Sequence, residues 1–550
     1  MKHRIILAAA LAVRLTLTAV AAEPAVPLLT SAEIGGFHRT VTTKLPDAQR
    51  YFDQGLALVY SFDHGNAIRS FQEAARLDPE CAMAWWGIAL ACGMHINFPM
   101  VPPERAALAW DALRHAQQGA AAGTPVEQAL IAAQRTRFAE KFPEDHGPLD
   151  QAYAAAMRGV WQKFPSDADV GVLFAEAMMN LRPWDLWQPD GRPQPGTAEI
   201  IATLGAVRQL APGHPQAQHL SIHALEASPD PAKALAAADA LRGRQPALGH
   251  MVHMASHIDV RTGRWAEAIV ANAAAVESDH RTRARFGTPE GFLWIYWAHN
   301  RHMLAYAAMM CGRDKLAQEH INAMAAELPA EWVKNWAFAA DYFLCMPYEV
   351  MVRFGHWDEI LAAPEPAENL PIARAIRHAV RGIAYAAKGN PAAGRAEQAA
   401  FAQGKAGIPA DGFYGNNNAG AVLGVAEAML EGELLVREGR TDEGVAQLRE
   451  AVKREDRLRY DEPPDWLIPV RHALGATLMN LGRYREAEQV YREDLARIAD
   501  NGWSLYGLGR TLQHLGRDYE AEPVLLKFNE VWARADFELT TSCLCQPGKK

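Results

Sequence analysis

Seven histidines and one glutamate lie in three short, related segments in the middle of the chain. The residues are His219, His223 and Glu226 in the first segment, His250, His253 and His257 in the second, and His299 and His302 in the third. His219 and His253 are 34 residues apart, and so are His223 and His257. Histidines four residues apart on a helix share one face, which is the spacing of the two-histidine step in zinc proteases. The pattern predicts a metal site.

These side chains favour a transition metal of intermediate softness. Neutral imidazole suits zinc, copper and iron, and the spacing does not select among them. Glu226 would be a further ligand, an orienter of a histidine, or the general acid or base of a reaction. A metal held in this way activates water or oxygen if one coordination position stays open.

Two other interpretations of the histidines remain open. A polar groove that binds an anionic peptide would use the same imidazoles as hydrogen-bond donors, without a metal. A repeat frame shifted by one residue would instead bury half of the histidines in the core.

A 34-residue repeat supplies the helices that must position these side chains. An early copy carries small, apolar or turn-forming residues at offsets of 12, 16, 19 and 24 from Gly55, namely Ala67, Phe71, Ala74 and Pro79. The period returns near the C-terminus, where Gly475 and Gly509 are 34 residues apart. The chain therefore resembles tetratricopeptide repeat (TPR) proteins, whose small residues let paired helices cross closely. We expect an all-α, TPR-like helical-repeat superhelix, an α-solenoid, because each repeat needs a neighbour to cover its apolar face.

The repeat frame places the histidines on one wall of this superhelix. His219, His253 and His302 fall at position 5 of the first helix of their repeats, His223 and His257 at position 9, His250 and His299 at position 2, and Glu226 at position 12. The TPR resemblance implies that these positions line the concave groove. Neighbouring helices pack about 8–10 Å apart, so two facing pairs of histidines would close around one or two ions.

The positions of the repeats, and of the segments between them, divide the chain into seven parts. These are a signal peptide at 1–22, an N-terminal TPR pair at 45–95, helical repeats with inserted loops at 96–210, histidine-rich TPR repeats with the metal site at 211–325, degenerate helical repeats at 326–420, C-terminal TPR repeats at 421–536 and a flexible tail at 537–550. Irregular inserts rich in proline, glycine and aromatic residues interrupt the 34-residue period at 95–105, 181–197, 409–420 and 459–469. Such loops either pack over one face, where function often lies, or fill space between helices.

The composition excludes several partners. Apolar residues make up 49% of the chain, charged residues 22%, and the net charge is −9, which is ordinary for a soluble protein. No basic run indicates nucleic acid, and no segment after the N-terminus is long enough and apolar enough for a transmembrane span. The N-terminus has basic residues, an apolar run and the small residues Ala19, Val20 and Ala21, which is typical of a secretory signal peptide. We expect a bacterial exported protein, either periplasmic or secreted.

Six cysteines are too few for a disulfide framework in a chain of this length. Four of them lie in apolar helical segments and are expected in the core, namely Cys81, Cys92, Cys311 and Cys345. Cys543 and Cys545, near the C-terminus, are expected to be exposed. They would pair with each other or with a partner, or bind a soft metal.

The chain also resembles a group of bacterial secreted TPR proteins that carry the strings LRPWDLW, HLSIHALEASP, HMASHIDVRTGRWAEA and HNRHM. This resemblance covers most of the chain after the leader and supports the fold and the site, but it supplies no activity. We expect a His/Glu metal site in the groove that supports oxidative or hydrolytic chemistry on a small molecule or peptide. A non-catalytic scaffold for a peptide or protein, and metal storage or delivery, are the alternatives.

Overall fold

The computed structural model describes residues 26–546, in which helices make up almost all of the regular structure. The strands β1 (Phe413–Tyr414) and β2 (Asn417–Asn418) form one short antiparallel pair. The expected all-α helical-repeat class is therefore confirmed. The signal peptide predicted at 1–22 lies outside the described residues. Among the described helices, none combines the length and the apolar character that crossing a bilayer requires.

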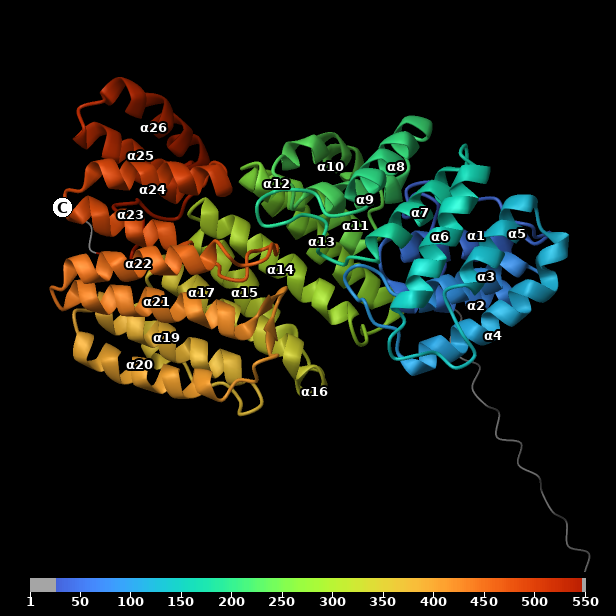
Figure 1. The fold of residues 1–550 in the computed structure, drawn as a ribbon, viewed down its shortest axis with the longest axis horizontal. Coiled ribbons are helices and arrows are strands. Elements are labelled where there is room, and N and C mark those ends of the chain that lie inside the picture. The colour runs from blue at the N-terminus through green and yellow to red at the C-terminus, as the bar shows by residue number, and fades with distance from the viewer. Residues whose placement is uncertain (1–25, 547–550) are drawn as a thin grey trace, which may run out of the picture.

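The N-terminal helices stack side by side and are drawn in blue and teal in Figure 1. They are α1 (Pro46–Tyr60), α2 (His64–Leu77), α3 (Ala82–Cys92), α4 (Pro103–Gly119), the 3-10 turn η1 (Ala120–Ala122), α5 (Pro125–Arg135), α6 (Gly147–Lys163), α7 (Ala168–Met179) and α8 (Thr197–Leu210). Each of these α-helices contacts the next along the chain, as a repeat array requires.

The central helices, drawn in green, carry the predicted histidines. They are α9 (Pro215–Leu225), η2 (Pro231–Ala234), α10 (Leu235–Leu241), α11 (Gly249–His253), α12 (Ala255–Arg261), α13 (Trp265–Phe286) and α14 (Leu293–Met310). The long helix α13 packs against α11, α12 and α14, so it supports three of the helices that bear histidines.

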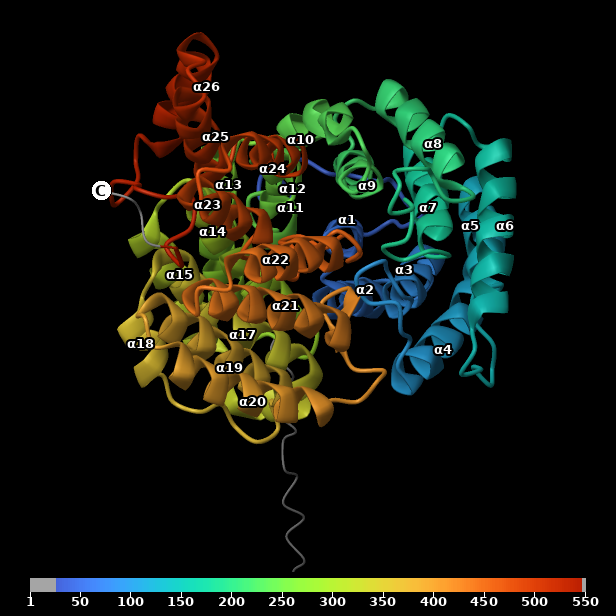
Figure 2. The same cartoon turned by 60° about the vertical axis from the view of Figure 1, so that its left-hand side comes forward.

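The C-terminal helices continue the superhelix in yellow, orange and red. They are α15 (Asp314–Glu327), α16 (Ala330–Asn335), α17 (Ala337–Phe354), α18 (Trp357–Ala362), α19 (Pro371–Ala387), α20 (Pro391–Ala406), α21 (Ala419–Arg437), α22 (Thr441–Glu455), α23 (Val470–Asn480), α24 (Tyr484–Arg497), α25 (Gly502–His514) and α26 (Asp518–Trp532). Figure 2 shows the array curving, with α19–α22 in front and the N-terminal helices on the right.

Small residues allow the paired helices to cross closely, as the repeat pattern predicts. A Cβ atom added to Gly55 on α1 would lie 2.7 Å from the ring of Phe71 on α2. One added to Gly475 on α23 would lie 2.4 Å from the ring of Tyr491 on α24. Any larger residue at either glycine would collide with its neighbour, so the crossing depends on the missing side chain.

The curvature brings the loop at 456–469, between α22 and α23, against the central helices. Arg459 donates to the main-chain oxygen of Trp184 at 3.4 Å, and the Arg261 guanidinium lies 5.3 Å from the centre of the Tyr460 ring. The inserts at 181–197 and 459–469 therefore pack together over one face of the superhelix, which was one of the two alternatives for these loops.

The C-terminal segment differs from the expectation of an exposed tail. Cys543 and Cys545 are 2% and 0% exposed and form a disulfide with each other. Leu539 is also buried, and the Ser542 hydroxyl hydrogen-bonds to the Tyr491 hydroxyl at 2.6 Å. The predicted exposure of the two cysteines is wrong because residues 539–546 fill space against the C-terminal helices and find polar partners there. The other four cysteines are buried, as expected: Cys81, Cys92, Cys311 and Cys345.

Candidate metal centre

Six of the seven predicted histidines meet in two groups of three. Triad A consists of His219 and His223 on α9 and His250 on α11; triad B consists of His253 on α11, His257 on α12 and His299 on α14. Within each triad, one ring nitrogen of every histidine lies within 4.8 Å of the others. The 34-residue spacing predicted that the pair His219 and His223 faces the pair His253 and His257, whereas these two pairs fall in different triads and each is joined by a third histidine.

Local helix geometry accounts for this arrangement. His219 and His223 are one turn apart on α9, with ring centroids separated by 4.8 Å. His253 and His257 repeat that step across the short junction between α11 and α12, with centroids 4.5 Å apart. Glu226 directly follows the last residue of α9, so its side chain returns to the same face as His223.

Five of the six triad histidines are buried, and His299 is partly exposed. His219 and His253 are 0% exposed, and His257 is 2% exposed. Inserted loops cover this part of the superhelix. Trp184 from one insert places its ring 5.8 Å from that of His223, and Glu462 from another reaches His257.

Hydrogen bonds fix which nitrogen of each imidazole faces the centre of triad B. Asn272 on α13 donates through Nδ2 to a main-chain carbonyl one turn earlier, so its Oδ1 accepts from His253 Nδ1 at 2.9 Å. His257 Nδ1 donates to Glu462 Oε2 at 2.7 Å and lies 2.8 Å from Glu226 Oε2. The Nε2 atoms of His253 and His257 then face each other at 2.7 Å. Two lone pairs at that distance repel unless a proton or a metal ion lies between them.

Triad A is held in the same way. His219 Nδ1 donates to the main-chain oxygen of Tyr60 at 2.9 Å, and His223 Nδ1 donates to Glu226 Oε1 at 2.9 Å. The Nε2 atoms of His219 and His250 are 3.1 Å apart. Within residues 26–546, His223 Nε2 and His250 Nδ1 are buried and have no hydrogen-bond partner. Buried polar atoms of this kind require an explanation, and a bound ion is one.

The two triads are adjacent. The ring centroids of His223 and His257 are 5.6 Å apart, and so are those of His250 and His253. Glu226 lies at this junction, with one carboxylate oxygen against a histidine of each triad. Two ligands of one tetrahedral zinc ion are about 3.3 Å apart, given zinc–nitrogen bonds of about 2.0–2.1 Å. Small ring rotations would bring each triad to that geometry.

The electrostatics keep most of the imidazoles neutral, as metal ligation requires. Burial, and then the neighbouring imidazoles, holds the pKa well below the usual range for His219, His250, His253 and His299. His257 differs because the carboxylates of Glu226 and Glu462 outweigh its burial and raise its pKa to about 10. Glu226 shows the reciprocal effect. Burial alone would raise its pKa, but His223 and His257 lower the pKa below its usual value. Burial raises the pKa of Glu462 to about 7.

His302 is the predicted ligand that the structure does not bring into either triad. Its side chain is 0% exposed, and its ring packs edge-on against Tyr342 and Phe343, at 5.8 and 6.1 Å. In the described chain, neither of its ring nitrogens has a hydrogen-bond partner. Burial alone lowers the pKa of His302 to about 3.

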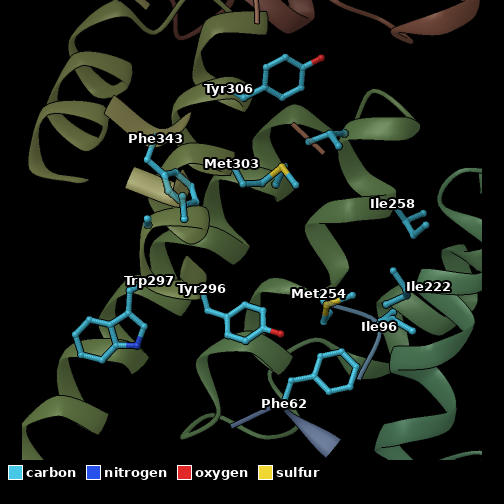
Figure 3. Close-up of a cluster of buried hydrophobic side chains, with 14 of the residues drawn as sticks. Phe62, Ile96, Ile222, Met254, Ile258, Tyr296, Trp297, Met303, Tyr306 and Phe343 are labelled. Carbon is cyan, nitrogen blue, oxygen red and sulfur yellow. The ribbon is translucent and has the colours of Figure 1, made fainter. Parts of the chain in front are cut away.

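Three contributors were not predicted as part of the site. Glu462 lies in an insert that the sequence marked only as a loop. Phe62 places its ring 4.7 Å from that of His219, with a backbone φ of 58° that is unusual for a bulky residue. Tyr296 places its ring 4.6 Å from that of His250. Figure 3 shows Phe62 and Tyr296 turned toward the same region, with Met254 nearby. No local signal in the sequence connects these residues to the histidines.

A cavity of about 450 Å³ opens beside the triads. His250, His257, His299 and Glu462 line it together with several aromatic side chains. A second, more polar cavity of about 620 Å³ reaches His223 and Glu226. The centre is thus buried in protein, yet accessible to a small molecule.

Comparison with known proteins supports the repeat architecture. A tetratricopeptide repeat family model matches residues 468–493, which cover α23 and part of α24. The comparison with curated proteins finds no match.

Solved structures match over most of the chain at low identity. The human IFIT1 dimer with m7Gppp-AAAA is 13% identical, with 91% of this chain and 93% of that chain covered and a TM-score of 0.33. Cut9–Hcn1, an APC/C hetero-tetramer, is 12% identical, with 90% and 76% covered and a TM-score of 0.28. Yeast Tom70 is 11% identical, with 88% and 89% covered and a TM-score of 0.29. Likenesses this distant carry no argument about function. The helix pairing shows an all-α helical-repeat fold, and the segment 468–493 within it is similar to a tetratricopeptide repeat.

Proposed function

We propose that triads A and B bind two transition-metal ions and that this centre supports oxidative or hydrolytic chemistry on a small molecule. The Nε2 atoms of His253 and His257, which face each other at 2.7 Å while both Nδ1 atoms are committed elsewhere, carry this proposal. Either a proton or a metal ion must lie between these two nitrogen atoms, and the convergence of a third imidazole, that of His299, favours the metal ion.

The donor set fits zinc, copper or iron. All six ligands are imidazoles, and no thiolate approaches either triad in the described part of the chain. Two adjacent ions would lie close enough to act on one substrate, as metal pairs about 3.5–4 Å apart do in many hydrolases. When bound, such ions activate water or oxygen for attack on the substrate.

The surrounding residues perform the other tasks of such a centre. Glu226 orients His223 and Glu462 orients His257, and Asn272 and the Tyr60 carbonyl orient two more histidines. Glu462, with its pKa near neutrality, can hold or release a proton close to His257. The aromatic walls exclude bulk water from the adjacent cavity.

Elemental analysis of the purified protein and of two variants tests the proposal. We expect two equivalents of a transition metal in the wild-type protein. His219→Gln, in triad A, and His253→Gln, in triad B, should each reduce the content to about one equivalent, because three ligands are needed to hold each ion. Circular dichroism would show whether the variants keep their helical content.

A protein without stoichiometric metal, in which neither variant alters binding of added zinc or copper, would contradict this proposal. Binding of a peptide or protein partner that survives complete chelation would instead favour a non-catalytic scaffold. Metal that leaves rapidly for an acceptor protein would favour storage or delivery.

We also propose that the protein is exported to the periplasm or beyond. The residue pattern at 1–22 supports this placement, as does the Cys543–Cys545 disulfide, because disulfides persist mainly in oxidising compartments. N-terminal sequencing of the mature protein from its source tests the proposal. Export predicts that the mature chain begins after the small residues near position 21, and an intact Met1 in the located protein would contradict it.

A further inference from the structure

The polar cavity that reaches His223 and Glu226 has no role in the function proposed above. It measures about 620 Å³, which is enough for a small molecule. Among the described residues, it shares only Ile96, Trp184 and Arg459 with the cavity that aromatic side chains line. The candidate metal centre therefore borders two separate cavities, and the polar one meets it at triad A.

Arg261, the last residue of α12, lines the polar cavity and is held there by two contacts. Its Nε donates to the main-chain oxygen of Glu226 at 3.0 Å, and its guanidinium lies 5.3 Å from the centre of the Tyr460 ring. Neither contact uses the two terminal nitrogens, for which no partner exists within residues 26–546. A guanidinium group binds carboxylates and phosphates through two parallel hydrogen bonds, so this pair of nitrogens is suited to an oxyanion.

The carboxylates that line the polar cavity already have partners. Three of them are paired with arginines at 2.7–3.0 Å: Asp185 with Arg182, Asp190 with Arg192, and Asp456 with Arg471. The fourth, Glu226, is 2% exposed and directs both of its oxygens at histidine nitrogens. In the described lining, Arg261 and Arg459 are the arginines that have no carboxylate partner. The unpaired charge that faces this cavity is therefore positive.

Ser228 offers a second donor, two residues after Glu226. Its hydroxyl oxygen accepts a hydrogen bond from the Asp230 main-chain nitrogen at 3.2 Å, and the residue is 2% exposed and lines the cavity. None of the described residues accepts the proton of this hydroxyl group. Ser228 can therefore donate it to an oxygen atom of a ligand.

We propose that the polar cavity binds a small molecule that carries a carboxylate or phosphate group, with this anionic group on Arg261 and Ser228. That the bound anion is the substrate of the metal centre rests on the proposed function, because His223 brings a ligand of triad A to the same cavity. The preference for an anion rests only on Arg261, on Ser228 and on the pairing of the other charges.

Calorimetric titration of the metal-loaded protein with three small probes tests the class of ligand. We expect at least one of the anions benzoate and phenylphosphonate to bind with one equivalent per chain. It should bind at least about tenfold more tightly than uncharged benzamide, because hydrogen bonds between charged groups are the stronger ones. The tighter of the two anions distinguishes a carboxylate from a phosphate ligand. Benzamide that binds as tightly as both anions would overturn the inference.

Arginine variants locate the anion. Arg261→Gln should weaken its binding about 10–100-fold. Arg261→Lys keeps the charge but loses the paired donors, so its affinity should lie between those of Arg261→Gln and the wild type. Arg497→Gln is the matched control, because Arg497 lines the same cavity but lies 3.4 Å from Asp456. It should change the affinity by no more than about twofold, as a paired surface charge contributes little.

Equal losses of affinity in Arg261→Gln and Arg497→Gln would overturn the inference, since the general charge of the cavity would then account for the binding. Circular dichroism and metal content would show whether Arg261→Gln keeps its fold and its ions. The comparison of anions with benzamide in the wild-type protein stands even if that variant does not fold.

Titrations after chelation separate this inference from the proposed function. If metal is present, its removal should weaken the anion, while the difference between the wild type and Arg261→Gln should remain. If elemental analysis finds no metal, the proposed function fails, but an anion whose binding needs Arg261 still supports the anion site. If metal is present and Arg261→Gln binds both anions as the wild type does, the anion site fails alone.

Discussion

At the scale of single residues, the hydrogen bonds made by the far nitrogens decide what the histidines can do. Glu226 places one carboxylate oxygen 2.9 Å from His223 Nδ1 and the other 2.8 Å from His257 Nδ1. His223 Nδ1 donates to Glu226 and His257 Nδ1 donates to Glu462, so the Nε2 atoms of both histidines are left to face the interior of their triads. Glu226 also lies close enough to His257 to attract it electrostatically.

Replacing Glu226 tests this role. Glu226→Gln keeps the size of the side chain but removes its charge, and we expect metal affinity to fall about 10–100-fold. Competition against a chromogenic chelator measures the change. Glu433→Gln is the matched control, because Glu433 is also buried but contacts Gln546 and not a histidine. Equal affinities for the two variants would show that Glu226 does not orient the ligands.

Replacing His302 should leave metal binding unchanged. The repeat frame predicts this residue as a ligand, but the structure separates it from the triads. His302→Leu should retain the full metal content. The free energy of unfolding should stay unchanged or rise by up to about 2 kcal/mol, since both buried ring nitrogens lack partners among the described residues. Chemical denaturation and elemental analysis measure the two effects. If His302→Leu lost one equivalent of metal, His302 would be a metal ligand.

At the scale of elements, each triad depends on how closely neighbouring helices approach. Triad A joins α9 to α11, and triad B joins α11 and α12 to α14. A shift of about 1 Å between these helices would separate the ligands, so the close crossings of the repeats matter for the site as well as for the core.

Two glycine substitutions test the crossings. Gly507 lies on α25, where an added Cβ atom would be 2.3 Å from the ring of Tyr491 on α24. Gly507→Ala should lower the free energy of unfolding by about 1–3 kcal/mol through overpacking. Gly205→Ala on α8 meets nothing within 4 Å and should raise it by about 0.5–1 kcal/mol, because alanine favours the helix. Urea denaturation compares them, and a stabilising Gly507→Ala would contradict the close crossing.

A buried carboxyl group on α17, which contacts the loop at 456–469, makes the stability of the folded state depend on pH. Glu349 accepts hydrogen bonds from the Leu467 main-chain nitrogen at 2.8 Å and the Tyr414 hydroxyl at 3.1 Å, and burial raises its pKa to about 8. The folded state therefore retains a proton that the unfolded state releases above pH about 4.3. Stability from this group is complete below that pH and is lost as the pH rises to about 8.

The variant Glu349→Gln should remove this contribution. The slope of unfolding free energy against pH should become less negative between pH 5 and 8 by up to about 1.4 kcal/mol per pH unit. Urea titrations at several pH values measure the slope. An unchanged slope would mean that Glu349 is ionised in the folded protein.

At the scale of the whole molecule, the curvature of the superhelix completes the site. His257 and Glu462 are 205 residues apart in sequence, yet their side chains are 2.7 Å apart. The first insert adds Phe98 to the cavity, and α17 adds aromatic rings from the other side. The centre thus lies where the N-terminal, central and C-terminal parts of the array meet.

This scale also explains how much the sequence could predict. The repeat period predicted the all-α fold. It also predicted that His219 and His223 face His253 and His257 around shared ions, whereas the structure places the two pairs in separate, adjacent triads. The period did not predict Glu462, since that contact depends on curvature summed over many repeats. It also placed His302 beside the other histidines, whereas the His302 ring packs against Tyr342 and Phe343. The buried state of Cys543 depends on a docking site that the tail itself does not reveal.

Locating the metal ions in crystals of the metal-loaded protein, by anomalous scattering at the absorption edge, tests the central claim most directly. We expect two peaks, each about 2.0–2.1 Å from one nitrogen of every histidine in one triad. Peaks at other residues, or triads whose imidazoles contact only one another in a protein that carries stoichiometric metal, would contradict it.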